Sequence, residues 1–204
     1  MSGKAILKEI GSTLLYIVVV LGITWLVITF VGQRTEVNGS SMEPTLSNND
    51  NLIVDKISYR FKDPQRFDII VFPFQYDENV YYIKRIIGLP GDKVKLEDGR
   101  LYVNGELVNR EEIEDFVIRD SQGNAERYHQ YIETLPNDVK HKILEVSDSE
   151  SEDNLPELTV PQGYYFVMGD NRDRSDDSRV NVGFVPFENL VGKARFLFFS
   201  HNDD

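Results

Sequence analysis

Two residues of this 204-residue chain, Ser41 and Lys84, could act together as a nucleophile and its base. A serine hydroxyl becomes nucleophilic when a neighbouring base removes its proton, and burial can lower the pKa of a lysine enough to make it that base. Ser41 lies in the segment 38–46 (NGSSMEPTL), where Gly39 permits unusual backbone angles and Pro44 stiffens the chain. Such a loop could fix a hydroxyl and a backbone N–H for oxyanion binding, although an ordinary turn has the same composition.

The second residue, Lys84, lies in an apolar, strand-like run that includes Ile83, Ile86 and Ile87. Because successive strand residues point to opposite faces, Lys84 and Arg85 should separate, one inward and one outward. Two interpretations are open for the amine. Either it is buried and can act as a base near neutral pH, or it extends from a strand edge to water.

Histidine, cysteine and metal chemistry have weaker support. The three histidines lie in an acidic stretch or in the tail, outside any motif, and the chain has no cysteine. The acid-rich segment 169–179 (GDNRDRSDDSR) invites comparison with a calcium loop. However, Arg172 and Arg174 stand where an EF-hand loop needs ligands, and the glycine at loop position six is absent. We therefore expect a charge-paired loop, with no metal and no cofactor.

The charge of the chain argues against one class of partner. The net charge is −12, whereas a nucleic-acid-binding protein would show a basic surface, so we expect no nucleic-acid partner. The acidity is also local: residues 109–158 contain fourteen acidic and five basic side chains. A solvated acidic lobe and a dedicated partner site both remain possible for this stretch.

Residues 10–32 contain no charged side chain and are long enough to cross a bilayer. These 23 helical residues would extend about 34 Å, and a hydrocarbon core is about 30 Å thick. A cleaved signal peptide is the alternative, but its apolar region is shorter and ends at a small-x-small site, which is lacking here. Lys4 and Lys8 precede the span and Arg34 follows it. The positive-inside rule therefore favours a cytoplasmic N-terminus, residues 1–9, with the remainder of the chain outside.

The remainder of the chain has the pattern of β-strands. Asp98-Gly99 and Asn104-Gly105 are typical of tight hairpin turns, so residues 94–108 should form a three-stranded meander. Other β-branched and aromatic runs, bounded by turn-forming residues, lie at 51–55, 67–72, 80–83, 163–168 and 194–199.

The fold class that follows is mainly β. We predict an antiparallel-sheet main domain of residues 35–105 and 159–204, a small acidic inserted subdomain of residues 106–158, and one N-terminal transmembrane helix. Within the insertion, residues 147–154 have the composition of a disordered segment.

Four ordered segments resemble those of bacterial signal peptidase I, a family of membrane-bound serine endopeptidases that remove signal peptides from exported proteins. They are 41–46 (SMEPTL), 66–72 (RFDIIVF), 82–92 (YIKRIIGLPGD) and 169–179, the last followed by GFVP at 183–186. Their order and the preceding anchor extend the resemblance over most of the chain, except about 106–160. The resemblance implies a catalytic β domain with an inserted second domain, peptide-bond hydrolysis by a Ser-Lys dyad, and no cofactor.

The resemblance implies catalytic or supporting roles for particular residues of these segments. Ser41, and not Ser40, matches the nucleophile, and Lys84 matches the general base. Ser175 matches the serine that hydrogen-bonds and orients the lysine. The loop's supporting ion pair is matched by Asp177 and Arg179, with Gly169 and Asp170 helping to shape it.

The resemblance also implies a substrate site. The family's substrates carry small residues at the −1 and −3 positions. By analogy, the pockets for these residues should be lined by Val37, Met42, Leu46, Tyr82 and Ile83.

The chain departs from the family pattern at two positions. Some members have a serine two residues before the nucleophile that helps to bind the oxyanion, whereas this chain has Gly39. The Ser41 backbone N–H is therefore the firm donor, and a contribution from Gly39 is uncertain. Glycine there, the single anchor and the short insertion are more similar to Gram-positive members. The second departure is Arg174, where many relatives have asparagine.

The implied location is the cell membrane, with the catalytic domain on the extracytoplasmic side. The implied partners are the signal peptides of exported preproteins and membrane lipid, and a contact with the secretion translocon is left open. Two other functions fit parts of the sequence. A self-cleaving Ser-Lys protein would normally be soluble, and a membrane-tethered β-domain that only binds exported chains would not need Ser41 and Lys84 together.

Overall fold

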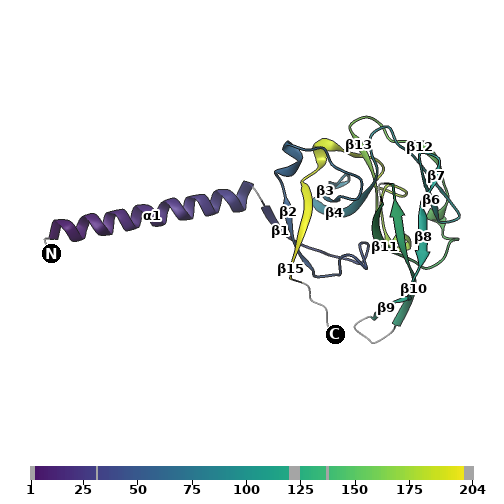
Figure 1. Cartoon of the computed structure of the whole chain (residues 1–204), viewed down its shortest axis with the longest axis horizontal. Coiled ribbons are helices and arrows are strands. Elements are labelled where there is room, and N and C mark those ends of the chain that lie inside the picture. The colour runs from purple at the N-terminus through teal and green to yellow at the C-terminus, as the bar shows by residue number, and fades with distance from the viewer. Residues whose placement is uncertain (1–2, 31, 120–124, 137, 200–204) are drawn as a thin grey trace.

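The computed structural model describes residues 3–30, 32–119, 125–136 and 138–199. Helix α1, Gly3–Phe30, projects from a body of β-strands as a separate rod (Figure 1). Its section Lys8–Trp25 is long and apolar enough to cross a membrane, and none of it is buried against protein. α1 ends at Phe30 and a strand begins at Gly32, and the predicted membrane span of 10–32 stays a prediction.

The largest sheet has seven strands and carries most of the predicted site. The antiparallel pairing of Gly32 with Asp55 makes the segment that follows the helix an edge strand. In spatial order the strands are β1 (Gly32–Glu36), β2 (Asn51–Asp55), β15 (Gly192–Phe199), β3 (Ile69–Phe74), β4 (Asp77–Gly88), β13 (Tyr164–Met168) and β14 (Val185–Pro186).

The predicted meander forms part of a second sheet. Asp98 and Gly99 have φ values of 47° and 68°, and Asn104 and Gly105 have φ values of 55° and 81°, as tight hairpin turns require. This four-stranded sheet has the order β12 (Leu155–Thr159), β5 (Lys93–Glu97), β6 (Arg100–Val103) and β7 (Glu106–Leu107).

The third sheet is formed within the acidic stretch. Its central strand β10 (Ala125–Leu135) pairs with β11 (Val139–Glu145), β8 (Asn109–Glu112) and β9 (Phe116–Arg119). We call this sheet, residues 109–145, the inserted lobe. The boundaries predicted at 106 and 158 cut through the second sheet, because β7 and β12 pair with β6 and β5.

Residues 147–154 do not follow the prediction of disorder. They form a 3₁₀ turn, Ser151–Asp153, with a capping box between Glu150 and Asp153. Asp153 is 1% exposed, so this acidic segment is anchored by a buried carboxylate. Three other 3₁₀ turns connect strands: Ser58–Arg60, Arg172–Arg174 and Phe187–Asn189.

The core lies in three clusters, and one of them lies beneath the predicted nucleophile. In it Val37, Met42, Leu46 and Leu52 are buried, and Ile83 packs against them. Burial of apolar side chains on both sides of Ser41 fixes the loop that carries it. The other two clusters join β4 and β13 to the second sheet and to β3.

Candidate active site

Ser41 and Lys84 meet across the first sheet. Lys84 Nζ lies 2.6 Å from Ser41 Oγ, within hydrogen-bond distance. Lys84 is on the long strand β4, and Ser41 lies in the loop between β1 and β2. That loop turns at Gly39, which has a φ of 103°, and is closed by the bond that the Gly39 N–H donates to Asn48 Oδ1 at 2.8 Å.

The Lys84 amine is buried, so its extension to water is the wrong interpretation. The residue is 4% exposed. Burial lowers the pKa of Lys84 to about 8, and the nearby carboxylates of Asp177 and Asp176 only partly oppose this effect. Within the described residues, no carboxylate lies within 4.0 Å of the amine. An amine with this pKa is neutral in an appreciable fraction of molecules near neutral pH and can accept the Ser41 proton.

A cavity of about 650 Å³ opens beside the dyad. Residues 35–42 form one side of it and residues 79–84 of β4 form the other. Strand β1 pairs only with β2, and residues 77–83 of β4 pair only with β3, so each side presents an unpaired backbone edge to the cavity. An extended peptide could therefore add to either edge by backbone hydrogen bonds.

Four of the five predicted substrate-contacting residues line this cavity: Val37, Met42, Tyr82 and Ile83. Leu46 does not line it and packs instead in the core cluster with Val37 and Met42. The Tyr82 hydroxyl donates to Asp176 Oδ2 at 3.1 Å, and the centre of its ring lies 5.3 Å from Lys84 Nζ. Tyr82 thus contributes to both the cavity wall and the surroundings of the amine.

Gly169 is required where the charge-paired loop, residues 169–179, meets the nucleophile. A Cβ atom at this position would lie 2.3 Å from Ser175 Oγ and 2.4 Å from the Ser41 carbonyl oxygen. The Gly169 N–H donates to Asp177 Oδ2 at 3.0 Å. A side chain at residue 169 would therefore displace Ser41 or Ser175.

The expected ion pair of the loop is present and buried. Arg179 donates from Nε to Asp177 Oδ1 and from Nη2 to Asp177 Oδ2, each at 2.9 Å. The side chains of Asp177 and Arg179 are 0% and 1% exposed. The arginine holds the pKa of the Asp177 carboxyl below its usual range against the effect of burial, so the pair stays ionised.

Ser175 does not make its predicted bond to Lys84. Its side chain is buried, and Oγ has no hydrogen-bond partner among the described residues. The hydroxyl lies against Gly169, close to the Ser41 backbone. Its role in orienting Lys84 stays a prediction.

The expectation that one of Lys84 and Arg85 points outward is only partly correct. Arg85 does point away from Lys84, but not to solvent: it is 6% exposed and donates from Nε and Nη2 to the two carboxylate oxygens of Asp170, at 2.7 and 2.6 Å. Asp170 also accepts a bond from Thr45 Oγ1 at 2.5 Å. Asp170 of the charge-paired loop therefore bonds both to β4, through Arg85, and to the loop that carries Ser41, through Thr45.

Two contacts of the site have no sequence prediction. The Asn171 N–H donates to the Ser41 carbonyl oxygen at 3.1 Å, and its side-chain amide donates to the Ser40 carbonyl oxygen at 3.2 Å. Asn48 holds Gly39, so the Gly39 N–H is not free to bind an oxyanion. The Ser41 N–H makes no hydrogen bond within the described part of the chain and remains available. Asn171 binds backbone 131 residues away in sequence, which no local pattern signals, whereas Asn48 closes its own loop across nine residues.

Among the residues that the structure describes, one group of side chains could hold a metal ion, and it lies away from the dyad. Glu112, Asp115 and His129 gather on the surface of the inserted lobe, with His129 Nδ1 3.4 Å from an oxygen of each carboxylate. They are largely exposed; Glu112 and His129 lie on strands β8 and β10 of the third sheet, and Asp115 lies between β8 and β9. The chemistry of the Ser41–Lys84 pair needs no metal ion.

Comparison with known proteins agrees with this geometry. Residues 10–199 match the sequence profile of the family described as "Signal peptidase, peptidase S26". Signal peptidase I of Rickettsia prowazekii is 37% identical over 98% of this chain and 82% of its own length. Signal peptidase I of Rickettsia akari is 39% identical over 78% of this chain and 68% of its own length.

A solved structure of a signal peptidase I from Enterococcus faecalis is 34% identical, covers 66% of this chain and 98% of its own, and has a TM-score of 0.38. The likeness to Gram-positive members suggested by Gly39 stays a prediction. The chain belongs to the signal peptidase I family of peptidase S26, serine endopeptidases that cleave signal peptides from preproteins.

Proposed function

We propose that Ser41 is the nucleophile and Lys84 the general base of signal peptide cleavage in this chain. The observation that carries the proposal is the 2.6 Å contact between Ser41 Oγ and a lysine amine buried without a counter-ion. Neutral Lys84 takes the Ser41 proton as Oγ attacks the carbonyl carbon of the scissile bond. The Ser41 N–H stabilises the oxyanion that forms.

The second half of the reaction uses the same pair. The protonated Lys84 gives its proton to the nitrogen of the leaving amine, and the C–N bond breaks to leave an acyl ester on Ser41. Lys84, neutral again, then removes a proton from a water molecule that attacks the ester carbon. The ester C–O bond breaks, the carboxylic acid product leaves, and Lys84 returns the proton to Ser41 Oγ. The Asp177–Arg179 pair and Gly169 support this arrangement by shaping the loop behind Ser41.

We infer that the substrate binds as an extended strand in the cavity beside the dyad. The unpaired edges of β1 and β4 offer backbone donors and acceptors on either side. Val37, Met42, Tyr82 and Ile83 would then contact the small residues at −1 and −3. Leu46 acts from beneath, through the packing of Met42.

We further propose that α1 anchors the chain in the cell membrane, with a cytoplasmic N-terminus and an extracytoplasmic catalytic domain. The support is the apolar surface of Lys8–Trp25, which no part of the described protein covers. Lys4 and Lys8 on the N-terminal side agree with the positive-inside rule.

The test is cleavage of a preprotein by the detergent-solubilised chain, with the new N-terminus mapped. Ser41→Ala and Lys84→Ala should fold and leave the preprotein intact. The matched control is Ser40→Ala, which removes the neighbouring hydroxyl and should keep activity within about tenfold. Cleavage by Ser41→Ala, or its loss in a folded Ser40→Ala, would contradict the assignment.

A further inference from the structure

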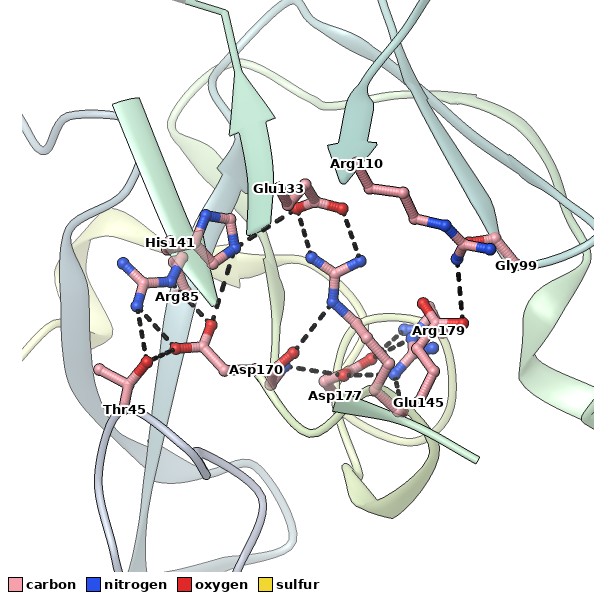
Figure 2. Close-up of polar contacts among 12 residues, drawn as sticks. Thr45, Arg85, Gly99, Arg110, Glu133, His141, Glu145, Asp170, Asp177 and Arg179 are labelled. Carbon is pink, nitrogen blue, oxygen red and sulfur yellow. Dashed lines mark hydrogen bonds and ion pairs between the residues drawn. The ribbon is translucent and has the colours of Figure 1, made fainter. Parts of the chain in front are cut away.

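A buried ionic cluster connects the inserted lobe to the charge-paired loop (Figure 2). Glu133 of β10 accepts bonds from Arg172 at both carboxylate oxygens, from Nη1 at 3.0 Å and from Nη2 at 2.5 Å. The two side chains are 3% and 2% exposed. A guanidinium bound at two points to a carboxylate has a fixed plane as well as a fixed position.

His141 of β11 lies between the Glu133–Arg172 ion pair and the Asp170–Arg85 ion pair. Its Nε2 is 3.3 Å from Glu133 Oε2 and 3.9 Å from Asp170 Oδ1, and Figure 2 shows the ring placed between the two carboxylates. Burial lowers the pKa of His141 to about 4, so the ring is neutral at pH 7. The carboxylates of Glu133 and Asp170 are then balanced by Arg172 and Arg85.

The backbone of the lobe also holds the loop. The Leu144 N–H donates to the Asp170 carbonyl oxygen at 2.8 Å. The Val146 and Ser147 N–H groups both donate to Asp173 Oδ2, at 2.6 and 3.2 Å. The inserted lobe and the two residues that follow it, Val146 and Ser147, thus contact the loop at each end of the segment 170–173.

Asn171 occupies the middle of that segment and holds the nucleophile. Its two bonds to the Ser40 and Ser41 carbonyl oxygens place it between the lobe's contacts and the reacting hydroxyl. The path from Glu133 to Ser41 therefore passes through only Arg172 and Asn171, which are neighbours in sequence. Arg172 Nε also donates to the Gly169 carbonyl oxygen at 3.2 Å.

Net stability alone does not explain a buried ion pair at this place. Replacing such a pair by apolar side chains is often neutral or stabilising, whereas two-point hydrogen bonding fixes geometry. We propose that Glu133 is a positioning residue for the Ser41–Lys84 dyad, acting through Arg172 and Asn171, and that the inserted lobe serves as the rear support of the active site. The proposal rests on the assignment of Ser41 and Lys84 above.

The first test is Glu133→Gln in the full-length enzyme, with preprotein cleavage measured at several substrate concentrations. The variant keeps the shape of the side chain and loses its charge. We expect kcat to fall by about tenfold or more while KM stays within about twofold, because the cavity is built from other residues.

A second variant is needed because Glu133→Gln leaves Arg172 buried without a counter-ion and can unfold the chain. Glu133→Leu combined with Arg172→Met removes both charges and keeps apolar bulk. We expect this double variant to fold and to show the same loss in kcat, measured per folded molecule below its Tm. A folded double variant with kcat within twofold of the unchanged chain would overturn the proposal, as would an effect confined to KM.

The control is Asp148→Asn, which breaks an arginine contact between the lobe and the segment that follows it. Arg110 Nη2 donates to both Asp148 oxygens, at 2.7 and 2.5 Å, and neither residue bonds to the charge-paired loop. We expect a lower Tm with unchanged kcat. Ser41→Ala in the same assay separates the two proposals: if it cleaves, the dyad assignment fails, whereas full activity of the Glu133 variants beside an inactive Ser41→Ala refutes the positioning role alone.

Discussion

Lys84 and Arg85 are consecutive residues of one strand, both buried, and they meet opposite surroundings. Lys84 faces a hydroxyl at 2.6 Å and no carboxylate within 4.0 Å among the described residues. Arg85, on the other face, is bound by both oxygens of Asp170. Burial therefore lowers the pKa of Lys84, whereas Arg85 is buried as one half of an ion pair.

The difference shows that burial alone does not decide what a cation does. Without a counter-ion, desolvation favours the neutral form, which is the form a base needs. With a two-point counter-ion the charge persists and serves as a structural contact. Alternation along β4 allows both outcomes at adjacent positions, since successive side chains lie on opposite faces.

The largest expected effect comes from giving Lys84 the permanent charge of its neighbour. Lys84→Arg cannot lose its proton at working pH, so we expect cleavage to fall by more than about 10³-fold. Preprotein cleavage with circular dichroism as the check on folding measures this. Appreciable activity in a folded Lys84→Arg would show that residue 84 is not the base.

The second effect comes from giving Arg85 the surroundings of Lys84. Asp170→Asn leaves the arginine buried without a charged partner, and the free energy of unfolding should fall by about 3–5 kcal/mol. Urea denaturation measures the change. Arg85→Met combined with Asp170→Leu should recover most of the loss, and a double variant no more stable than Asp170→Asn would argue against an effect of charge.

The third prediction concerns pH. Because the neutral amine is the reactive form, kcat/KM should rise with pH and level off above about 8, the pKa of Lys84. Burial raises the pKa of Glu43 to about 7, so the profile should also be measured in Glu43→Gln. The Asp176 carboxylate favours the charged amine, and Asp176→Asn should therefore move the acid limb to lower pH. A limb that is unmoved in Asp176→Asn, or lost in Glu43→Gln, would contradict the assignment to Lys84.

The smallest effect is expected at an exposed ion pair. Lys93 and Glu157 are in contact at 2.9 Å, with side chains 56% and 46% exposed. Glu157→Gln should change the free energy of unfolding by less than about 1 kcal/mol, because water screens such pairs. Urea denaturation of Glu157→Gln and Asp170→Asn side by side tests this. Losses of similar size in the free energy of unfolding would contradict the distinction between the exposed Lys93–Glu157 pair and the buried Arg85–Asp170 pair.

Much of the fold follows from local sequence. The strand 51–55 and the meander turns at Asp98-Gly99 and Asn104-Gly105 are found where predicted, because hydrophobic alternation and positive φ are properties of short segments. Strand β1 was not predicted, since Gly32–Glu36 is polar and becomes a strand only by pairing with β2. The sheet boundaries of the insertion depend on pairing of β12 with β5, across some sixty residues of chain, and no local pattern encodes them.

The residues of the site also separate into those that local sequence could predict and those that it could not. Ser41 and Lys84 could be found from their types and their family-like neighbours, and their 2.6 Å contact agrees with that choice. The partners Asn48, Asn171 and Glu133 could not, because each bonds to a residue that only the fold brings close. Leu46 was assigned to the cavity wall from its nearness in sequence to Ser41, but packing turned it into the core.

The junction between α1 and β1 has a consequence for which bond is cut. Only residue 31 separates the end of the helix at Phe30 from the start of the strand at Gly32, and β1 is held to β2 along its whole length. From Phe30 to Ser41 the chain advances eleven residues, so at about 3.3 Å per residue Ser41 lies at most roughly 36 Å from the end of α1. If α1 lies in a bilayer as proposed, this short connection limits how far from the membrane the scissile bond of a preprotein can lie when it reaches Ser41.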